Sequence, residues 1–193
     1  LIRSARVMPV REAASAILEH GSLPIAVVAL GAGNAQQESA LVGALARSKI
    51  PPDIDGEPSI EFYLVDSSMN LLSEAYELAT EQLASFSIPV CAIEGDFNRL
   101  PTFSDMFSAR GPRRKVFTLL GYTVGNLDNE LAFLRDCLIG TNRGDLLLID
   151  FVLRDDDGKD VQASLKHDPM AGILASGGTV KTNKLVAFLA GPV

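Results

Sequence analysis

A run of small apolar residues ends in two glycines that could bring the backbone close to a ligand. The stretch is VVALGAGNA, residues 27–35, in which Gly31 and Gly33 follow the apolar part. Glycine adopts a positive φ without strain, and it lacks the Cβ that would keep a ligand away from the main chain. We therefore predict that this turn contacts a ligand. The alternative is a tight turn that binds nothing.

Acidic residues follow the next two apolar runs. Asp66 ends EFYLVD, and Asp96 ends PVCAIEGD with Phe97 directly after it. A carboxylate at the end of a second strand can accept hydrogen bonds from both hydroxyls of a ribose. The second acid adds an acceptor for an exocyclic amine, and the aromatic ring gives a base a surface to pack on. Together they predict an adenosine site, although Asp66 could instead cap the following helix and Asp96-Phe97 could be a capped turn.

The glycine turn distinguishes two classes of adenosine cofactor. A dinucleotide-binding fold uses G-x-G-x-x-G, and its third glycine position is occupied here by Gln36. S-adenosylmethionine carries no phosphate and requires backbone groups near its methionine part and acids near its nucleoside. The sequence therefore favours S-adenosylmethionine. The alternatives are an NAD(P)-dependent oxidoreductase-type Rossmann domain and a non-catalytic cofactor-binding or interaction domain.

The elements that must position these residues alternate between strand and helix. Two further apolar runs, KVFTLLGY and DLLLIDFVL, predict strands, and a last strand is expected at 185–189. Helical periodicity is present in four segments: 4–20, 36–48, 69–86 and 129–139. In 69–86 it places Leu71 on the apolar face together with Leu72 and Ala75. Strands that are apolar almost throughout are typical of a parallel sheet covered on both faces. We predict an α/β fold with a doubly wound, mostly parallel, Rossmann-like sheet.

These motifs resemble class I S-adenosylmethionine-dependent methyltransferases, and within that group the histidine-specific N-methyltransferase family of ergothioneine biosynthesis. The similarity rests on five stretches over residues 25–153: VVALGAGNAQQ, YLVDSSMNLLSEA, GDFNRLP, FTLLGYTVGNLDNELAFLRDCL and GDLLLIDFVL. Its most particular element is G-x-T-x-G-N-L, which starts at Gly121. The resemblance implies transfer of a methyl group to a small-molecule amine, such as the amino group of histidine.

The resemblance also implies roles for cofactor-site residues. Gly31 would contact the methionine part of the cofactor, Asp66 the ribose, and Asp96 with Phe97 the adenine. A single S-adenosylmethionine-binding domain is expected over 1–193, with its core at 25–153 and an extension on the substrate side at 154–193.

Further site residues follow the strands. We assign Gly33 and Gly121 to the cofactor site, and Tyr122 and Asn126 to the substrate site. Asn126 matches the family asparagine that holds the substrate amino acid. The sequence identifies no catalytic residue, and it shows no nucleophile paired with a base.

The chain departs from the family in three ways. Gln37 stands where the family commonly has a lysine, and the tyrosine expected after the fifth strand is not evident near Lys166 to Asp168. The family also uses an upstream segment and further C-terminal sequence to recognise its substrate, and the 193 residues of this chain do not supply them. Because the chain begins with Leu1 and ends just after an apolar run, we expect it to be part of a longer protein.

Charge and composition bound the partners. The 193 residues carry a formal net charge of -7, which disfavours nucleic acid and anionic membranes and suits a small cationic or zwitterionic molecule. We interpret the basic run RGPRRK, 110–115, as a solvated loop. The two histidines share no spacing with Cys or acidic residues that suggests a metal.

Other sequence features bear on location. Two cysteines do not make a disulfide framework, no apolar stretch approaches the ~20 residues that cross a bilayer, and the N-terminus lacks a signal-peptide layout. We expect a cytoplasmic location. The sequence does not determine the oligomeric state.

Overall fold

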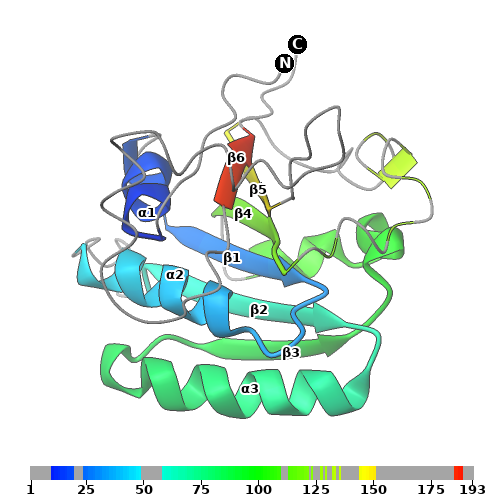
Figure 1. Cartoon of the computed structure of the whole chain (residues 1–193), viewed down its shortest axis with the longest axis horizontal. Helices are drawn as coiled ribbons and strands as arrows, with labels where there is room; N and C mark the ends of the chain where they lie inside the picture. The colour runs from blue at the N-terminus through cyan, green and yellow to red at the C-terminus, as the bar shows by residue number, and fades with distance from the viewer. Residues whose placement is uncertain are drawn as a thin grey trace, which may run out of the picture.

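The computed structural model describes residues 10–19, 24–48, 58–109, 113–121, 144–150 and 185–188, together with six residues in between: Thr123, Leu127, Asn129, Ala132, Phe133 and Arg135. Within these residues the chain forms one twisted sheet flanked by helices (Figure 1).

The described residues form a six-stranded sheet in the order β3-β2-β1-β4-β5-β6. The strands are β1 Ile25–Leu30, β2 Ile60–Asp66, β3 Val90–Glu94, β4 Arg114–Leu119, β5 Leu146–Asp150 and β6 Leu185–Phe188. The first five pair in parallel, and β6 pairs antiparallel with β5. The strand order reverses between β1 and β4, which makes the carboxyl ends of these strands the expected place for a ligand.

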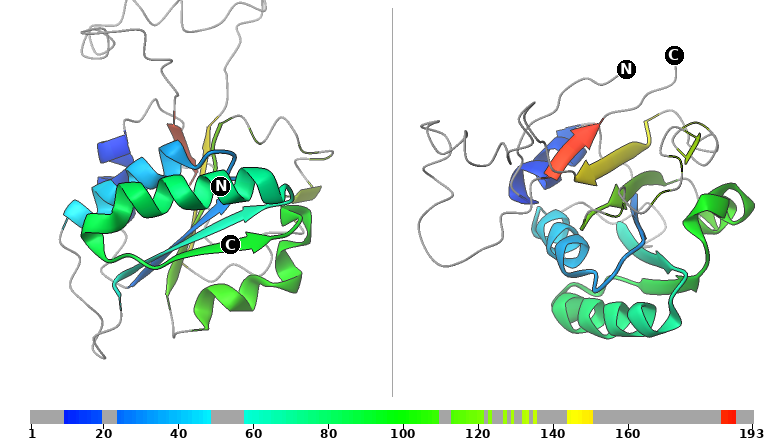
Figure 2. Two further views of the ribbon diagram at one scale, coloured as in Figure 1. Left: turned by 90° about the horizontal axis from the view of Figure 1, so that it is seen from below. Right: turned by 45° about the vertical axis from the view of Figure 1, so that its right-hand side comes forward.

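Three α-helices pack on one face of the sheet: α1 Val10–Glu19, α2 Gln36–Arg47 and α3 Met69–Leu83. The other face is covered by two 3-10 helices, η2 Phe97–Thr102 and η3 Ser104–Ser108, with Phe133 beside them. A third, η1 Ala84–Phe86, continues α3. Figure 2 shows α3 on one side of the sheet and the green helical turns on the other.

The alternation of side chains along each strand divides the core in two. In β1, Val27 and Ala29 face the α-helices, whereas Ala26, Val28 and Leu30 face the opposite layer. Every residue of β1 is buried, because helical elements cover both faces of this central strand. The continuous apolar run in the sequence is the consequence of this double burial.

The predicted strands and the mostly parallel sheet are confirmed, as are the helices expected at 36–48 and 69–86. The helix predicted at 4–20 is described from Val10 to Glu19. Most of the helix predicted at 129–139 lies outside the described residues, as does 154–184. No helix in the described ranges is long and apolar enough to cross a membrane.

One expectation about α3 is wrong. Leu71 has the periodicity of a core residue, but its side chain is 43% exposed. The buried face of α3 is formed by Leu72, Ala75, Ala79 and Leu83. Leu71 instead lies at the end of α3 that adjoins the carboxyl edge of the sheet.

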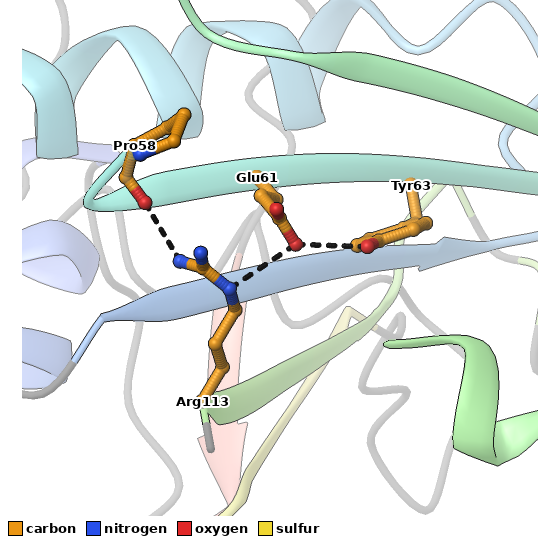
Figure 3. Close-up of polar contacts among 4 residues, drawn as sticks. All are labelled: Pro58, Glu61, Tyr63 and Arg113. Carbon is orange, nitrogen blue, oxygen red and sulfur yellow. Dashed lines mark hydrogen bonds and ion pairs between the residues drawn. The ribbon is translucent and has the colours of Figure 1, made fainter. Parts of the chain in front are cut away.

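The interpretation of RGPRRK as a solvated loop is also wrong for its described part. Arg113, Arg114 and Lys115 are each 5% exposed or less, because they lead into and begin the central strand β4. Figure 3 shows how the first of them is held: Arg113 Nε lies 3.2 Å from Glu61 Oε2, and Arg113 Nη1 donates to the carbonyl of Pro58 at 2.7 Å. The hydroxyl of Tyr63 donates to the same Glu61 oxygen at 2.8 Å.

The two following basic residues are paired as well. Arg114 Nη1 donates to the carbonyl of Ile17 in α1 at 2.9 Å, and Lys115 Nζ lies 3.9 Å from Asp145 Oδ2. Burial lowers the pKa of Arg114, and the negative charge of Asp145 opposes that change. These charges lie at the amino ends of β2 and β4, so they stabilise the edge of the sheet opposite the ligand edge.

Candidate functional site

A cavity of about 630 Å³ opens at the carboxyl ends of β1, β2 and β4. This volume lies within the range of roughly 300–1,000 Å³ that is usual for small-molecule sites. Its described lining comes from five parts of the chain: Gly31–Asn34, Gln36–Glu38, Asp66 and Ser67 with Leu71, Asp96–Asn98, and Leu120 and Gly121 with Thr123. The cavity therefore lies where the topology places a ligand.

The glycine turn after β1 forms one wall. Gly31 has φ +66° and Gly33 has φ +53°, so both adopt the left-handed conformation that favours glycine. The N–H of Gly31 donates to the carbonyl of Val65 at 2.8 Å, which ties the turn to the end of β2. A Cβ added to Gly31 would lie 2.6 Å from Thr123 Cγ2 and 3.1 Å from Phe97 Cε1. Gly31 is thus required both by its backbone conformation and by its neighbours.

Asp66 ends β2 and is 8% exposed. Its Oδ1 accepts from the N–H of Ser68 at 2.9 Å, and its Oδ2 accepts from the N–H of Gly33 at 3.3 Å. The cap of α3 is Ser68, whose Oγ accepts from the N–H of Leu71. Asp66 therefore holds the loop before the helix without being its cap. Because each carboxylate oxygen has two lone pairs, both can still accept from a ligand.

Asp96 and Phe97 follow β3 and line the cavity as well. Asp96 Oδ1 accepts from the backbone N–H and from the side-chain amide of Asn98, both at 2.9 Å, so the capped turn considered from the sequence is present. The half-buried ring of Phe97 packs edge-on against Phe133, with 5.8 Å between centroids. Both residues also line the cavity, so the capped turn and a ligand contact are compatible.

Described residues of the loop after β4 also line the cavity. Gly121 lines it and has φ +71°. Thr123 is 8% exposed and lines it as well. Tyr122 and Asn126, the predicted substrate residues, lie outside the described residues. All six predicted cofactor residues line this one cavity: Gly31, Gly33, Asp66, Asp96, Phe97 and Gly121.

Sequence reasoning missed several lining residues, above all Glu38. It lies in the first turn of α2 and is 4% exposed, although an acidic residue is seldom buried to this extent. Its position in the first turn, where the helix dipole favours a negative charge, was the available signal. Gln37, the departure from the family lysine, lies beside it in the lining.

The cavity is acidic. Glu38, Asp66 and Asp96 contribute carboxylates, and the described lining contains no lysine, arginine or histidine. A ligand with a net positive charge is electrostatically favoured over a neutral one in such a site. The described residues hold no cluster of His, Cys, Asp and Glu side chains that could bind a metal ion.

Three solved structures are similar to this chain at low sequence identity. A proposed rRNA-methylase from Clostridium thermocellum superposes with a TM-score of 0.52 at 11% identity, over 93% of each chain. The YcgJ protein of Bacillus subtilis gives a TM-score of 0.49 at 16% identity, over 74% of this chain and 51% of that one. A magnesium protoporphyrin IX methyltransferase from Synechocystis, solved with S-adenosylhomocysteine, gives 0.49 at 15% identity, over 95% and 66%.

At 11% identity, the Clostridium thermocellum structure supports the α/β fold and nothing more about this chain. This chain spans about half the length of the Bacillus subtilis protein. No curated protein matches the sequence.

The family comparison is more specific. The family described as histidine-specific, S-adenosylmethionine-dependent methyltransferases matches residues 10–164, which include every strand from β1 to β5 and all the described cavity segments. Since this match covers well over half of the sequence, the chain belongs to the family of histidine-specific, S-adenosylmethionine-dependent methyltransferases.

Proposed function

We propose that the chain binds S-adenosylmethionine in this cavity and transfers its methyl group to the amine of a small molecule. The observation that supports the proposal best is that Gly31, Asp66 and Asp96, which lie at the carboxyl ends of three different strands, line a single cavity. An adenosine site needs these three features at one edge of the sheet.

The residues present fit this cofactor. Asp66 would bind the ribose hydroxyls through its remaining lone pairs, and Asp96 with the ring of Phe97 would bind the adenine. The backbone at Gly31 and Gly33 would contact the methionine part, and Gly121 would lie beside it. The absence of a cation from the described lining suits a cofactor with a net positive charge better than a dinucleotide with a pyrophosphate.

When bound, S-adenosylmethionine supplies a methyl group that its sulfonium already makes electrophilic. The protein must therefore align the acceptor's lone pair with the bond from sulfur to methyl and exclude water. Such a transfer would join the acceptor nitrogen to the methyl carbon, leave the electron pair of the broken bond on sulfur, and release one proton from the amine. Few catalytic side chains are needed, which agrees with the lack of a nucleophile and base pair in the sequence.

An amine acceptor is supported by the acidic cavity and by the family description. We propose that the methyl acceptor is the amino group of an amino acid such as histidine, and that Tyr122 and Asn126 contact this substrate.

The net charge of -7 argues against nucleic acid and anionic membranes as partners. We also propose that residues 1–193 form a single S-adenosylmethionine-binding domain and that the protein is cytoplasmic. The free thiol of Cys91 is compatible with the latter.

Calorimetry of the full-length protein tests the proposed cofactor. We expect binding of S-adenosylmethionine and no binding of NAD, and the reverse result would favour the oxidoreductase alternative. Methyl transfer is tested by mass spectrometry with L-histidine and a panel of other amino acids and amines. Binding without any transfer would favour the non-catalytic alternative.

A further inference from the structure

Thr123 connects the loop after β4 to the glycine turn after β1. Its Oγ1 lies 2.7 Å from the carbonyl oxygen of Leu120 and 3.3 Å from that of Gly31. A hydroxyl has one hydrogen, so it donates fully to only one of the two carbonyls. The shorter contact, to Leu120, is the stronger bond, and the carbonyl of Gly31 therefore keeps accepting capacity for another donor.

The other half of Thr123 fixes Gly31 by contact. Thr123 Cγ2 fills the space that a Cβ of Gly31 would need, and Phe97 Cε1 approaches the same space from another direction. Gly31 is thus close to two side chains that both line the cavity. Its N–H is bonded to Val65, so its main chain is held on several sides.

We infer that Thr123 is a positioning residue for the amino-acid part of the cofactor, and that it acts through Gly31. The inference rests on the proposed function, because Gly31 is the residue proposed to contact the methionine part. The Thr123 hydroxyl holds the loop through Leu120, and this places Cγ2 against Gly31 and leaves the Gly31 carbonyl available to a donor of the ligand. Thr123 needs no contact with the adenosine for this role.

Two ligands that differ in the amino-acid part test the inference. S-adenosylhomocysteine has this part, whereas 5′-methylthioadenosine lacks it and keeps the adenosine. In Thr123→Val a methyl group replaces the hydroxyl and faces both carbonyls. We expect the affinity for S-adenosylhomocysteine to fall about 3- to 10-fold, because the loop loses its hydrogen bond to Leu120 and no longer holds Gly31 in place. The affinity for 5′-methylthioadenosine should change less than about 2-fold.

Two further variants separate positioning from a general effect on the fold. Thr123→Ser keeps the hydroxyl and loses only Cγ2, so it should lose less affinity for S-adenosylhomocysteine than Thr123→Val does. Thr102→Val is the matched control, since the exposed Thr102 hydroxyl also donates to the carbonyl three residues earlier at 2.7 Å but does not line the cavity. This control should bind both ligands as the wild type does.

The reverse contact gives an independent test if Thr123→Val does not fold. Gly31→Ala should weaken S-adenosylhomocysteine binding, and adding Thr123→Ser should recover part of the loss, because the atom 2.6 Å from the new Cβ is then absent. Equal weakening of both ligands by Thr123→Val, or no recovery in the double variant, would overturn the inference. If the wild type binds neither ligand, the proposed function itself fails.

Discussion

The carboxylate of Asp66 accepts a hydrogen bond from the backbone N–H of Gly33, with 3.3 Å between Oδ2 and N. This bond joins the end of β2 to the turn after β1, although the residues are 33 positions apart. The acid proposed to bind the ribose therefore also orders the turn proposed to bind the methionine part. Disturbing either partner should affect both halves of the cofactor site.

Replacing Asp66 by Asn should weaken S-adenosylmethionine binding by about 10-fold or more, because hydrogen bonds to a charged acceptor are lost. An amide also presents a donor to one of the two backbone N–H groups, of Gly33 and Ser68, so the melting temperature should fall slightly. Calorimetry and thermal unfolding measure the two effects. The exposed Asp105, which does not line the cavity, gives the control Asp105→Asn. Wild-type affinity in Asp66→Asn would remove Asp66 from the ribose site.

Replacing Gly31 by Ala should reduce both stability and cofactor affinity. A residue other than glycine at φ +66° costs roughly 1–2 kcal/mol, and the new Cβ meets Thr123 Cγ2 at 2.6 Å. Urea unfolding and calorimetry measure the result. Gly43→Ala in α2 is the contrasting variant, because the nearest atom to a Cβ there lies 3.6 Å away and alanine favours the helix. A Gly31→Ala protein as stable and as tight-binding as Gly43→Ala would contradict the geometry of the turn.

The acidic cavity should prefer S-adenosylmethionine over S-adenosylhomocysteine, because the sulfonium gives the former one more positive charge. We expect the affinity for S-adenosylmethionine to be severalfold higher at low salt, and the difference to become smaller as salt is added. Added salt shortens the Debye length from about 10 Å at 0.1 M to about 3 Å at 1 M, and so screens the attraction between the carboxylates and the sulfonium. Glu38→Gln should narrow the difference at every salt concentration, whereas Glu77→Gln, on the exposed side of α3, should not. Calorimetry with both ligands over a salt series checks this. A ratio unaffected by salt and by Glu38→Gln would show that the carboxylates do not sense the sulfonium.

The buried pair of Glu61 and Arg113 should matter for stability and little for binding. Their side chains are 3% and 1% exposed, and removing one partner leaves the other charged and buried, which typically costs about 3–5 kcal/mol. We expect this loss for Arg113→Met, and partial recovery in the double variant with Glu61→Gln. Urea denaturation measures it, with calorimetry on the folded protein as the second measurement. A variant that keeps its stability but loses cofactor affinity would place the pair in the functional site.

The periodicity of the sequence predicts the sheet well because β1, β2 and β4 are buried on both faces. Such strands must be apolar along most of their length, so local composition alone reveals them. Their positions then identify the turns that follow, which is why six cavity residues could be named in advance. The sequence could not place Leu71 correctly, because its spacing matches that of the residues on the buried face of α3. Only the tertiary structure shows that Leu71 lies at the cavity.

The charged residues show where prediction from sequence ends. The run at 110–115 has the composition of a solvated loop, yet its last three residues are buried where β4 begins. Their partners come from three other parts of the chain: Ile17 in α1, Pro58 and Glu61 around the start of β2, and Asp145 before β5. No local pattern records pairing over such separations.

Local composition determined the elements of this protein and the residue types at the end of each strand, since backbone conformation and double burial act on neighbouring residues. Tertiary structure alone decided which of those ends meet, that Thr123 touches Gly31 across 92 positions, and that Glu38 is buried in the cavity. The reason is physical: contacts between distant segments depend on strand order and on packing, and neither is encoded in the spacing of residues along one segment.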